Sequence, residues 1–180
     1  MKHLNALLPE VPYELKDFVI CDEAVRLLEG YFLRELLIFV ATKGSALVDY
    51  RGHSKIDVST IECLVKLTDL DIKEIYQEKS YFYEAAARAV LDPISGTEIL
   101  NSDQVEKAQG EVWRLIEDWG ASLADQQARE LVLGFVTHAI KRVIIEAGNH
   151  ANSLGRKTIW LPDIFAISGI LPWPLEKWLC

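Results

Sequence analysis

The chain has 180 residues, of which 50% are hydrophobic and 26% charged, and its formal net charge at pH 7 is -8. This length and composition fit one well-buried domain or two small units packed closely together, and they exclude a largely disordered chain. No apolar run approaches the roughly 20 residues that a membrane span needs. Because the start of the chain has no signal-like apolar stretch and the three cysteines lack metal-ligand spacing, we expect a cytoplasmic protein with reduced thiols and no membrane contact.

The negative charge is unevenly distributed along the chain. Residues 1–68 hold 8 basic and 10 acidic side chains, residues 69–110 hold 4 and 9, and residues 111–180 hold 7 and 8. We therefore predict a first folded unit at 1–68, an acidic helical connector at 69–110, and a second folded unit at 111–180 that ends in an apolar tail, all within one compact domain. Neither outer unit has the positive excess typical of proteins that coat DNA.

The first unit is predicted to contain one long helix and one short helix. Apolar residues at spacings of three and four follow Asp22, a suitable N-cap residue, and predict the long helix. Gly52 is a natural stop for that helix. Residues 55–58 alternate as a short extended piece, and we expect Ser59 or Thr60 to start the short helix.

The connector is predicted to be structured. Residues 70–90 have the apolar spacing of one or two helices, and residues 92–96 have the composition of a turn. Residues 101–110 form a polar approach to the next helix, with Ser102 as its cap. The connector is therefore not a flexible tether.

The second unit repeats the order of the first. A short helix at 111–119 precedes a long helix that starts after Asp125 and stops at Gly155, followed by an extended piece at 157–160 and a closing helix with Pro162 as its first residue. Residues 22–64 and 125–167 align at a constant offset of 103 positions. The shared residues are Asp22, Leu28, Phe32, Val40, Gly52, Ile56 and Ile61, which recur as Asp125, Leu131, Phe135, Val143, Gly155, Ile159 and Ile164.

This order of elements resembles the histone fold, and the second copy is similar to archaeal-type histones. The similarity lies in Trp113-Arg114-Leu115-Ile116 with Gly120, and in Gly155-Arg156-Lys157-Thr158-Ile159 with Asp163-Ile164. The resemblance implies an all-α protein with two histone folds in one chain, which form an intramolecular head-to-tail pseudodimer. Such pairing would bury the apolar face of each copy at high effective concentration.

The resemblance also implies a structural clamp between Arg156 and Asp163, which would tie the second loop to the last helix. A bidentate, charge-assisted contact would fix the shape of this loop, and an exposed pair would contribute about 1 kcal/mol or less. The first copy has His53 and Thr60 at these positions. We therefore expect that end of the pseudodimer to be less rigid.

Polar residues of the two loops, with Arg114 of the short helix before the second copy, are candidate phosphate contacts. We expect them to be joined in space, because each extended loop of a head-to-tail pair would lie beside the partner's first loop. The candidates are Arg51, His53, Ser54, Lys55, Arg114, Arg156, Lys157 and Thr158. Glu117 and Leu123 stand where histones usually carry basic residues, so strong wrapping of DNA is not expected. The alternative is a solvated loop with ordinary surface charge.

The sequence carries no catalytic or metal-binding motif, and we expect neither an enzyme nor a cofactor. It has no phosphate-cradling glycine loop and no nucleophile motif, and its four histidines lack metal-ligand spacing. We expect His138 and His150 to be satisfied or partly exposed histidines of one helix.

Two functions remain open from the sequence. The first is a prokaryotic histone-like doublet that binds duplex DNA weakly and in a salt-sensitive way, associated with the nucleoid. The second is a histone-fold scaffold that binds protein and not DNA. Its partner would be another protein or a second copy of the chain, bound through Trp160, the acidic connector and the C-terminal tail.

Overall fold

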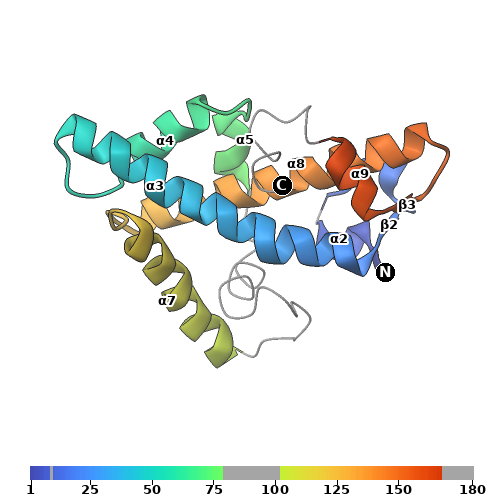
Figure 1. The fold of residues 1–180 in the computed structure, drawn as a ribbon, viewed down its shortest axis with the longest axis horizontal. Helices are drawn as coiled ribbons and strands as arrows, with labels where there is room; N and C mark the ends of the chain where they lie inside the picture. The colour runs from blue at the N-terminus through green and yellow to red at the C-terminus, as the bar shows by residue number, and fades with distance from the viewer. Residues whose placement is uncertain (9, 79–101, 168–180) are drawn as a thin grey trace. The chain divides into compact units, whose positions relative to one another are not determined.

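The computed structural model describes residues 1–8, 10–78 and 102–167, and these residues are mostly helical (Figure 1). The predicted all-α class is confirmed at this level. The described residues fall into two compact units. The first combines Met1–Leu28 with the chain from Ala139 onward, and the second runs from Glu29 to His138. The predicted turn at 92–96 and the apolar tail after residue 167 lie outside the described residues.

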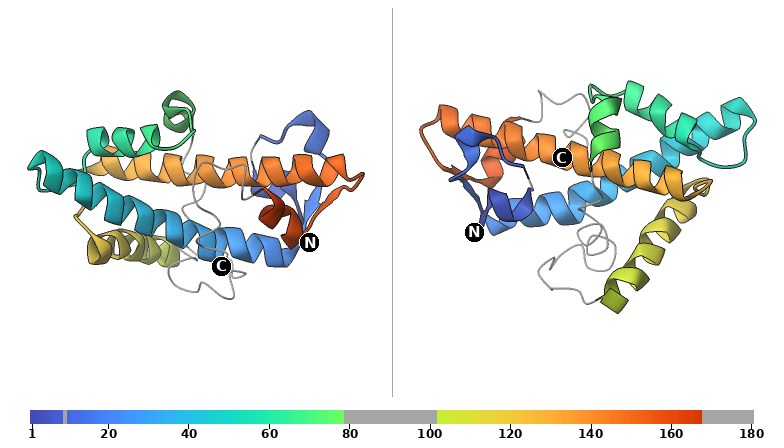
Figure 2. Two further views of the ribbon diagram at one scale, coloured as in Figure 1. Left: turned by 45° about the horizontal axis from the view of Figure 1, so that its top comes forward. Right: turned by 180° about the vertical axis from the view of Figure 1, so that it is seen from behind.

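The first unit contains a small three-stranded sheet with the order β1-β2-β3. The strands are β1 (Lys2–His3), β2 (Val19–Ile20) and β3 (Thr158–Ile159), with β1 antiparallel and β3 parallel to β2. The helices of this unit are α1 (Leu4–Leu7), the 3-10 turn η1 (Tyr13–Leu15), α2 (Asp22–Arg26), α9 (Leu161–Ala166) and the later part of α8 (Gln126–Ser153). Within this unit α9 packs against α2 (Figure 2).

The second unit is built on α3 and contains no strand among its described residues. Its helices are α3 (Leu33–Arg51), α4 (Val58–Lys66), α5 (Ile72–Gln77), α7 (Ser102–Trp119) and the first part of α8. Buried residues recur along α3 at spacings of three and four, and α3 packs against both α4 and α7. This stripe is the apolar face that the sequence pattern predicted.

Both predicted helix stops are confirmed. Gly52 has φ 68° and Gly155 has φ 72°, and this left-handed conformation suits glycine because it has no Cβ. Gly52 donates its N–H to the Asp49 carbonyl, and His53 donates to the Val48 carbonyl. These bonds satisfy carbonyl groups at the end of α3.

Several predicted helix boundaries are wrong. Cys21, not Asp22, is the N-cap residue of α2, because the Asp22 carboxylate accepts a hydrogen bond from the Met1 amino group at 2.9 Å. The first long helix is also interrupted, since a π-helical segment, η2 (Leu27–Phe32), separates α2 from α3. The short helix α4 starts at Val58, ahead of the predicted start, because the Asp57 side chain accepts the Thr60 N–H at 2.8 Å and caps it.

The starts of two further helices, α7 and α9, also differ from the predicted ones. Residues 102–110 are the first half of α7 and not a polar approach to it, so Ser102 is a helical residue. The closing helix α9 starts at Leu161, which makes Pro162 its second residue. There the Asp163 side chain accepts the Trp160 N–H and closes the first turn one residue earlier than predicted.

Candidate functional site: paired loops and an Arg156–Asp163 clamp

The same loop pairing occurs once in each unit. In the first unit, the Cys21 N–H donates to the Ile159 carbonyl at 3.0 Å. In the second unit, the Ala124 N–H donates to the Ile56 carbonyl at 2.8 Å, and Ile56 and Leu123 form a parallel bridge. Positions 21 and 124 are 103 apart, as are positions 56 and 159. Each unit therefore pairs the segment before one long helix with the loop after the other, at equivalent positions of the repeat.

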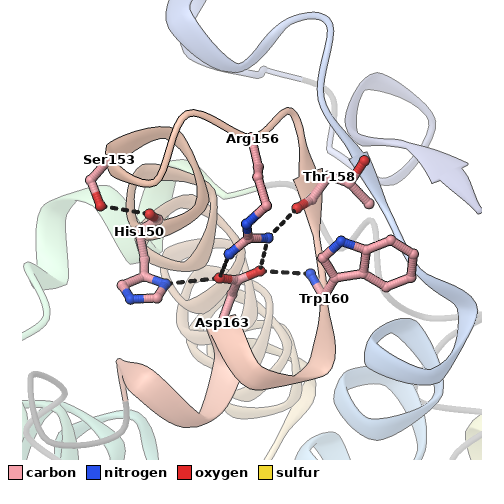
Figure 3. A network of polar contacts seen from close by, with 6 residues as sticks. All are labelled: His150, Ser153, Arg156, Thr158, Trp160 and Asp163. Atoms are coloured by element: carbon pink, nitrogen blue, oxygen red, sulfur yellow. Dashed lines mark hydrogen bonds and ion pairs between the residues drawn. The ribbon is translucent and has the colours of Figure 1, made fainter.

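A network of polar contacts fixes the loop after α8 (Figure 3). The Arg156 guanidinium donates from Nη1 to Asp163 Oδ2 at 3.0 Å and from Nη2 to Asp163 Oδ1 at 2.6 Å. Arg156 also donates to the Thr158 carbonyl at 2.9 Å, and Asp163 accepts the Trp160 N–H at 2.7 Å. His150 Nδ1 lies 2.8 Å from Asp163 Oδ1. The two hydrogen bonds between Arg156 and Asp163 form the bidentate clamp that the resemblance implied, and His150 is an additional member.

The Asp163 carboxylate is buried, whereas Arg156 is 35% exposed. Burial by itself would raise the pKa of Asp163, but the hydrogen bonds from Arg156, the Trp160 N–H and His150 outweigh it and lower the pKa to about 2. In turn, the hydrogen bond to Asp163 raises the pKa of Arg156. The limit of about 1 kcal/mol for an exposed pair therefore does not apply to this clamp, because its carboxylate is buried.

The clamp predicts acid sensitivity of the first unit. The pKa of Asp163 is lower in the folded chain than its ordinary value of 3.8, so ionised Asp163 stabilises the fold above about pH 4. This contribution, about 2 kcal/mol, should be lost as the pH falls from about 4 to about 2. Urea unfolding between pH 5 and pH 2 measures it. The variant Asp163→Asn should lack this part of the pH dependence, and an unchanged profile in that variant would contradict the assignment.

The first copy holds its loop in a different way. Thr60 occupies the repeat position of Asp163, is fully buried, and donates its hydroxyl to Asp57 Oδ1 at 2.7 Å. This hydrogen bond is the main cause that lowers the pKa of Asp57. His53 Nδ1 lies 3.8 Å from Asp57 Oδ2. A capping carboxylate inside the loop therefore replaces the arginine clamp at this end.

The basic candidates of the loop after α8, the second-copy loop, face partners within the chain. Arg156 is held by Asp163, and the Thr158 carbonyl accepts from Arg156. Lys157 Nζ lies 3.8 Å from Asp17 Oδ2, with both side chains well exposed. The predicted cations of the second-copy loop are therefore partly neutralised.

The first-copy loop is more open. Arg51 donates to Ser59 Oγ at 3.0 Å and to Cys63 Sγ at 2.8 Å. Neither of these partners is a carboxylate. The side chains of Ser54 and Lys55 are exposed, and Arg114 lies on α7, outside this loop. This loop therefore presents the positive charges of Arg51 and Lys55 to solvent.

Backbone hydrogen bonds show which segment each loop pairs with. The backbone neighbours of Lys157 and Ile159 are Val19 and Cys21, and those of Ile56 are Ser122 and Ala124. Each loop thus pairs with the segment before the other copy's long helix, which is the arrangement expected for the extended loops. The two sets of candidate residues belong to different units.

Large apolar side chains are exposed around the clamped loop. Leu154 is 58% exposed, Trp160 is 43% exposed and Phe165 is 42% exposed. They lie just before the loop, at the N-cap of α9 and within α9. The clamp fixes the backbone that carries Trp160, since Asp163 accepts its N–H.

The sequence reasoning did not identify His150 as part of this site. Its position in the last turn of α8 was the available signal, but the contact with Asp163 joins residues 13 positions apart and depends on how the loop folds back. His138, for which the sequence predicts a satisfied or partly exposed histidine, is satisfied. Its ring nitrogens lie 3.1 Å from Glu78 Oε1 and 3.3 Å from Glu74 Oε2.

Comparison of the sequence with models of known protein families and with curated proteins gives no match of either kind. Among the helices of the described ranges, none combines the length and apolar character needed to cross a bilayer. Within residues 1–8, 10–78 and 102–167, no three His, Cys, Asp or Glu side chains converge as metal ligands would.

Proposed function

We propose that the chain is a histone-fold doublet whose two copies pair head to tail within one polypeptide. The observation that carries this proposal is the recurrence of the parallel loop pairing at an offset of 103 residues, once in each unit. In addition, each unit contains residues from both copies, as a head-to-tail pair requires. Covalent linkage makes such pairing intramolecular and independent of protein concentration.

For this doublet, the function that the geometry supports best is a protein-interaction scaffold. At the second-copy loop the cations face carboxylates of the same chain, whereas Leu154, Trp160 and Phe165 are exposed. Tryptophan is frequent among the residues that dominate binding energy at protein interfaces. Because the clamp already orders the loop, binding a partner there costs less conformational entropy of the loop than binding to a mobile loop would.

Affinity capture with matched variants tests the scaffold proposal. The full chain should retain a partner at stoichiometric amount from cells that express it. The double variant Trp160→Ser/Phe165→Ser should lose this partner, because both exposed rings are removed. The backbone N–H of position 160, which donates to Asp163, remains. Tyr50→Ser, which removes an exposed ring in the other unit, is the control and should retain the partner. Retention by the double variant, or capture of no stoichiometric partner, would contradict the proposal.

A second candidate function is weak binding of duplex DNA, favoured by the exposed side chains of Arg51, Lys55 and Arg114 in the second unit. Three phosphate contacts predict that the affinity falls roughly 40-fold between 50 and 200 mM salt. Fluorescence anisotropy with a labelled duplex measures this dependence. The triple alanine variant of these residues should lose binding, and Lys157→Ala should change it little. No binding at 50 mM salt would exclude this candidate.

A further inference from the structure

The second unit contains a pocket that the loop site does not use. It has a volume of about 490 Å³ and is formed by residues of α4, of α5 with the position after it, and of the first turns of α8. This size lies within the range of ordinary ligand pockets. Val58, Ile75 and Leu131 supply apolar surface, so part of the wall is suited to an aliphatic chain.

The remaining wall is polar and acidic. Glu78 lines the pocket with a side chain that is only 13% exposed, and His138 Nδ1 lies 3.1 Å from its Oε1 atom. Glu130 lines the pocket from the exposed side of α8, and the Gln126 amide lies 3.4 Å from its Oε1 atom. Of the described residues that line the pocket, none is lysine or arginine. The pocket therefore combines apolar surface with two carboxylates from different segments.

Neighbouring contacts hold this wall in place. His138 bridges Glu78 and Glu74, so the histidine positions the Glu78 carboxylate. The Tyr76 hydroxyl donates to Glu62 at 2.7 Å, and this hydrogen bond raises the pKa of Tyr76 to about 12. Tyr76 is thus a neutral donor that is engaged with Glu62, and it adds no further charge to the pocket.

We propose that this pocket binds an arginine side chain of a protein partner. The methylene stem of arginine would pack on Val58, Ile75 and Leu131, as such stems do on apolar surfaces. The guanidinium would face Glu78 and Glu130. Its planar array of five N–H donors can serve two carboxylates that approach from different directions, whereas the ammonium of lysine is a compact, strongly hydrated charge.

This inference deepens the scaffold proposal and rests on it for the identity of the partner as a protein. The pocket does not include Trp160 or Phe165. Its test uses a small probe instead of a natural partner. Failure of the probe to bind therefore removes the arginine site and leaves the result at the Trp160 surface unaffected, and the reverse also holds.

The test is a titration of the full chain with the peptide acetyl-Gly-Arg-Gly-amide, followed by amide chemical shifts in ¹⁵N-labelled protein. We expect weak saturable binding with shifts concentrated at Val58, Ile75 and Leu131. The peptide in which citrulline replaces arginine keeps the shape and loses the charge, and it should bind about tenfold more weakly or worse. The corresponding lysine peptide should also bind more weakly than the arginine peptide.

Variants of the exposed rim keep the test independent of folding. Glu130→Gln should weaken arginine binding about fivefold, and Gln127→Lys, which places a competing ammonium at the pocket, should weaken it more. Glu117→Gln removes an exposed carboxylate of α7 outside the pocket and should leave binding unchanged. Equal binding of the citrulline or lysine peptide, absence of binding, or no effect of the Glu130 and Gln127 variants would overturn the proposal.

Discussion

The variant Asp163→Asn should lower the free energy of unfolding by about 3 kcal/mol. The buried carboxylate accepts four close contacts, two from Arg156 and one each from His150 and the Trp160 N–H. Asparagine keeps the size but removes the charge, and its amide group presents donors to donors. The expected loss is at the low end for a buried pair because Arg156 is 35% exposed. Denaturant unfolding measures it.

Two comparisons separate the clamp from a general effect of mutation. A double-mutant cycle with Arg156→Met should give a coupling energy of about 1 to 2 kcal/mol, since the two residues act as a pair. At the matching repeat position of the first copy, Thr60→Val should cost about 1.5 kcal/mol, because the hydrogen bond from its hydroxyl to the Asp57 carboxylate is lost. A loss below 1 kcal/mol in Asp163→Asn would show that the clamp behaves as an exposed ion pair.

The variant Gly134→Ala should lower the free energy of unfolding by about 2 kcal/mol. A Cβ atom at this position of α8 would lie 2.8 Å from the Ile75 carbonyl oxygen, which is closer than real Cβ atoms come. Alanine is the better helix former by about 1 kcal/mol, but the contact with the backbone outweighs this gain. Thermal and denaturant unfolding of the purified variant measure the difference.

Gly110→Ala provides the matched control for this prediction. Gly110 lies inside α7, and an added Cβ would meet nothing within 4 Å. The same chemical change should therefore stabilise the chain by about 0.5 to 1 kcal/mol. Equal signs for the two variants would contradict the close approach of α8 to Ile75.

The parts of the fold that depend on local pattern could be predicted from the sequence. The apolar stripe of α3 and the stops at Gly52 and Gly155 follow from helical periodicity and from the backbone freedom of glycine. The Arg156–Asp163 contact was predicted from the resemblance of the second copy to histones. These features need only residues that are near in sequence.

The parts that depend on tertiary contacts could not be predicted. Asp22 is a residue type that often caps helices, but its carboxylate accepts a hydrogen bond from the Met1 amino group. Lys157 has the position of a phosphate contact, but Asp17, which lies 140 residues earlier in the chain, faces it at 3.8 Å. Spacing alone gives no sign of such partners. Such pairs reduce the positive charge that the second-copy loop can offer to a phosphate group.

The most direct test of the head-to-tail doublet is the detection of its two loop pairings by scalar coupling across hydrogen bonds in the full chain. The proposal predicts one coupling from the Cys21 amide nitrogen to the Ile159 carbonyl carbon and a second from the Ala124 amide nitrogen to the Ile56 carbonyl carbon. Both should be present at protein concentrations where the chain is monomeric. Detection of one coupling without the other, or loss of both on dilution, would contradict an intramolecular pair of equivalent copies.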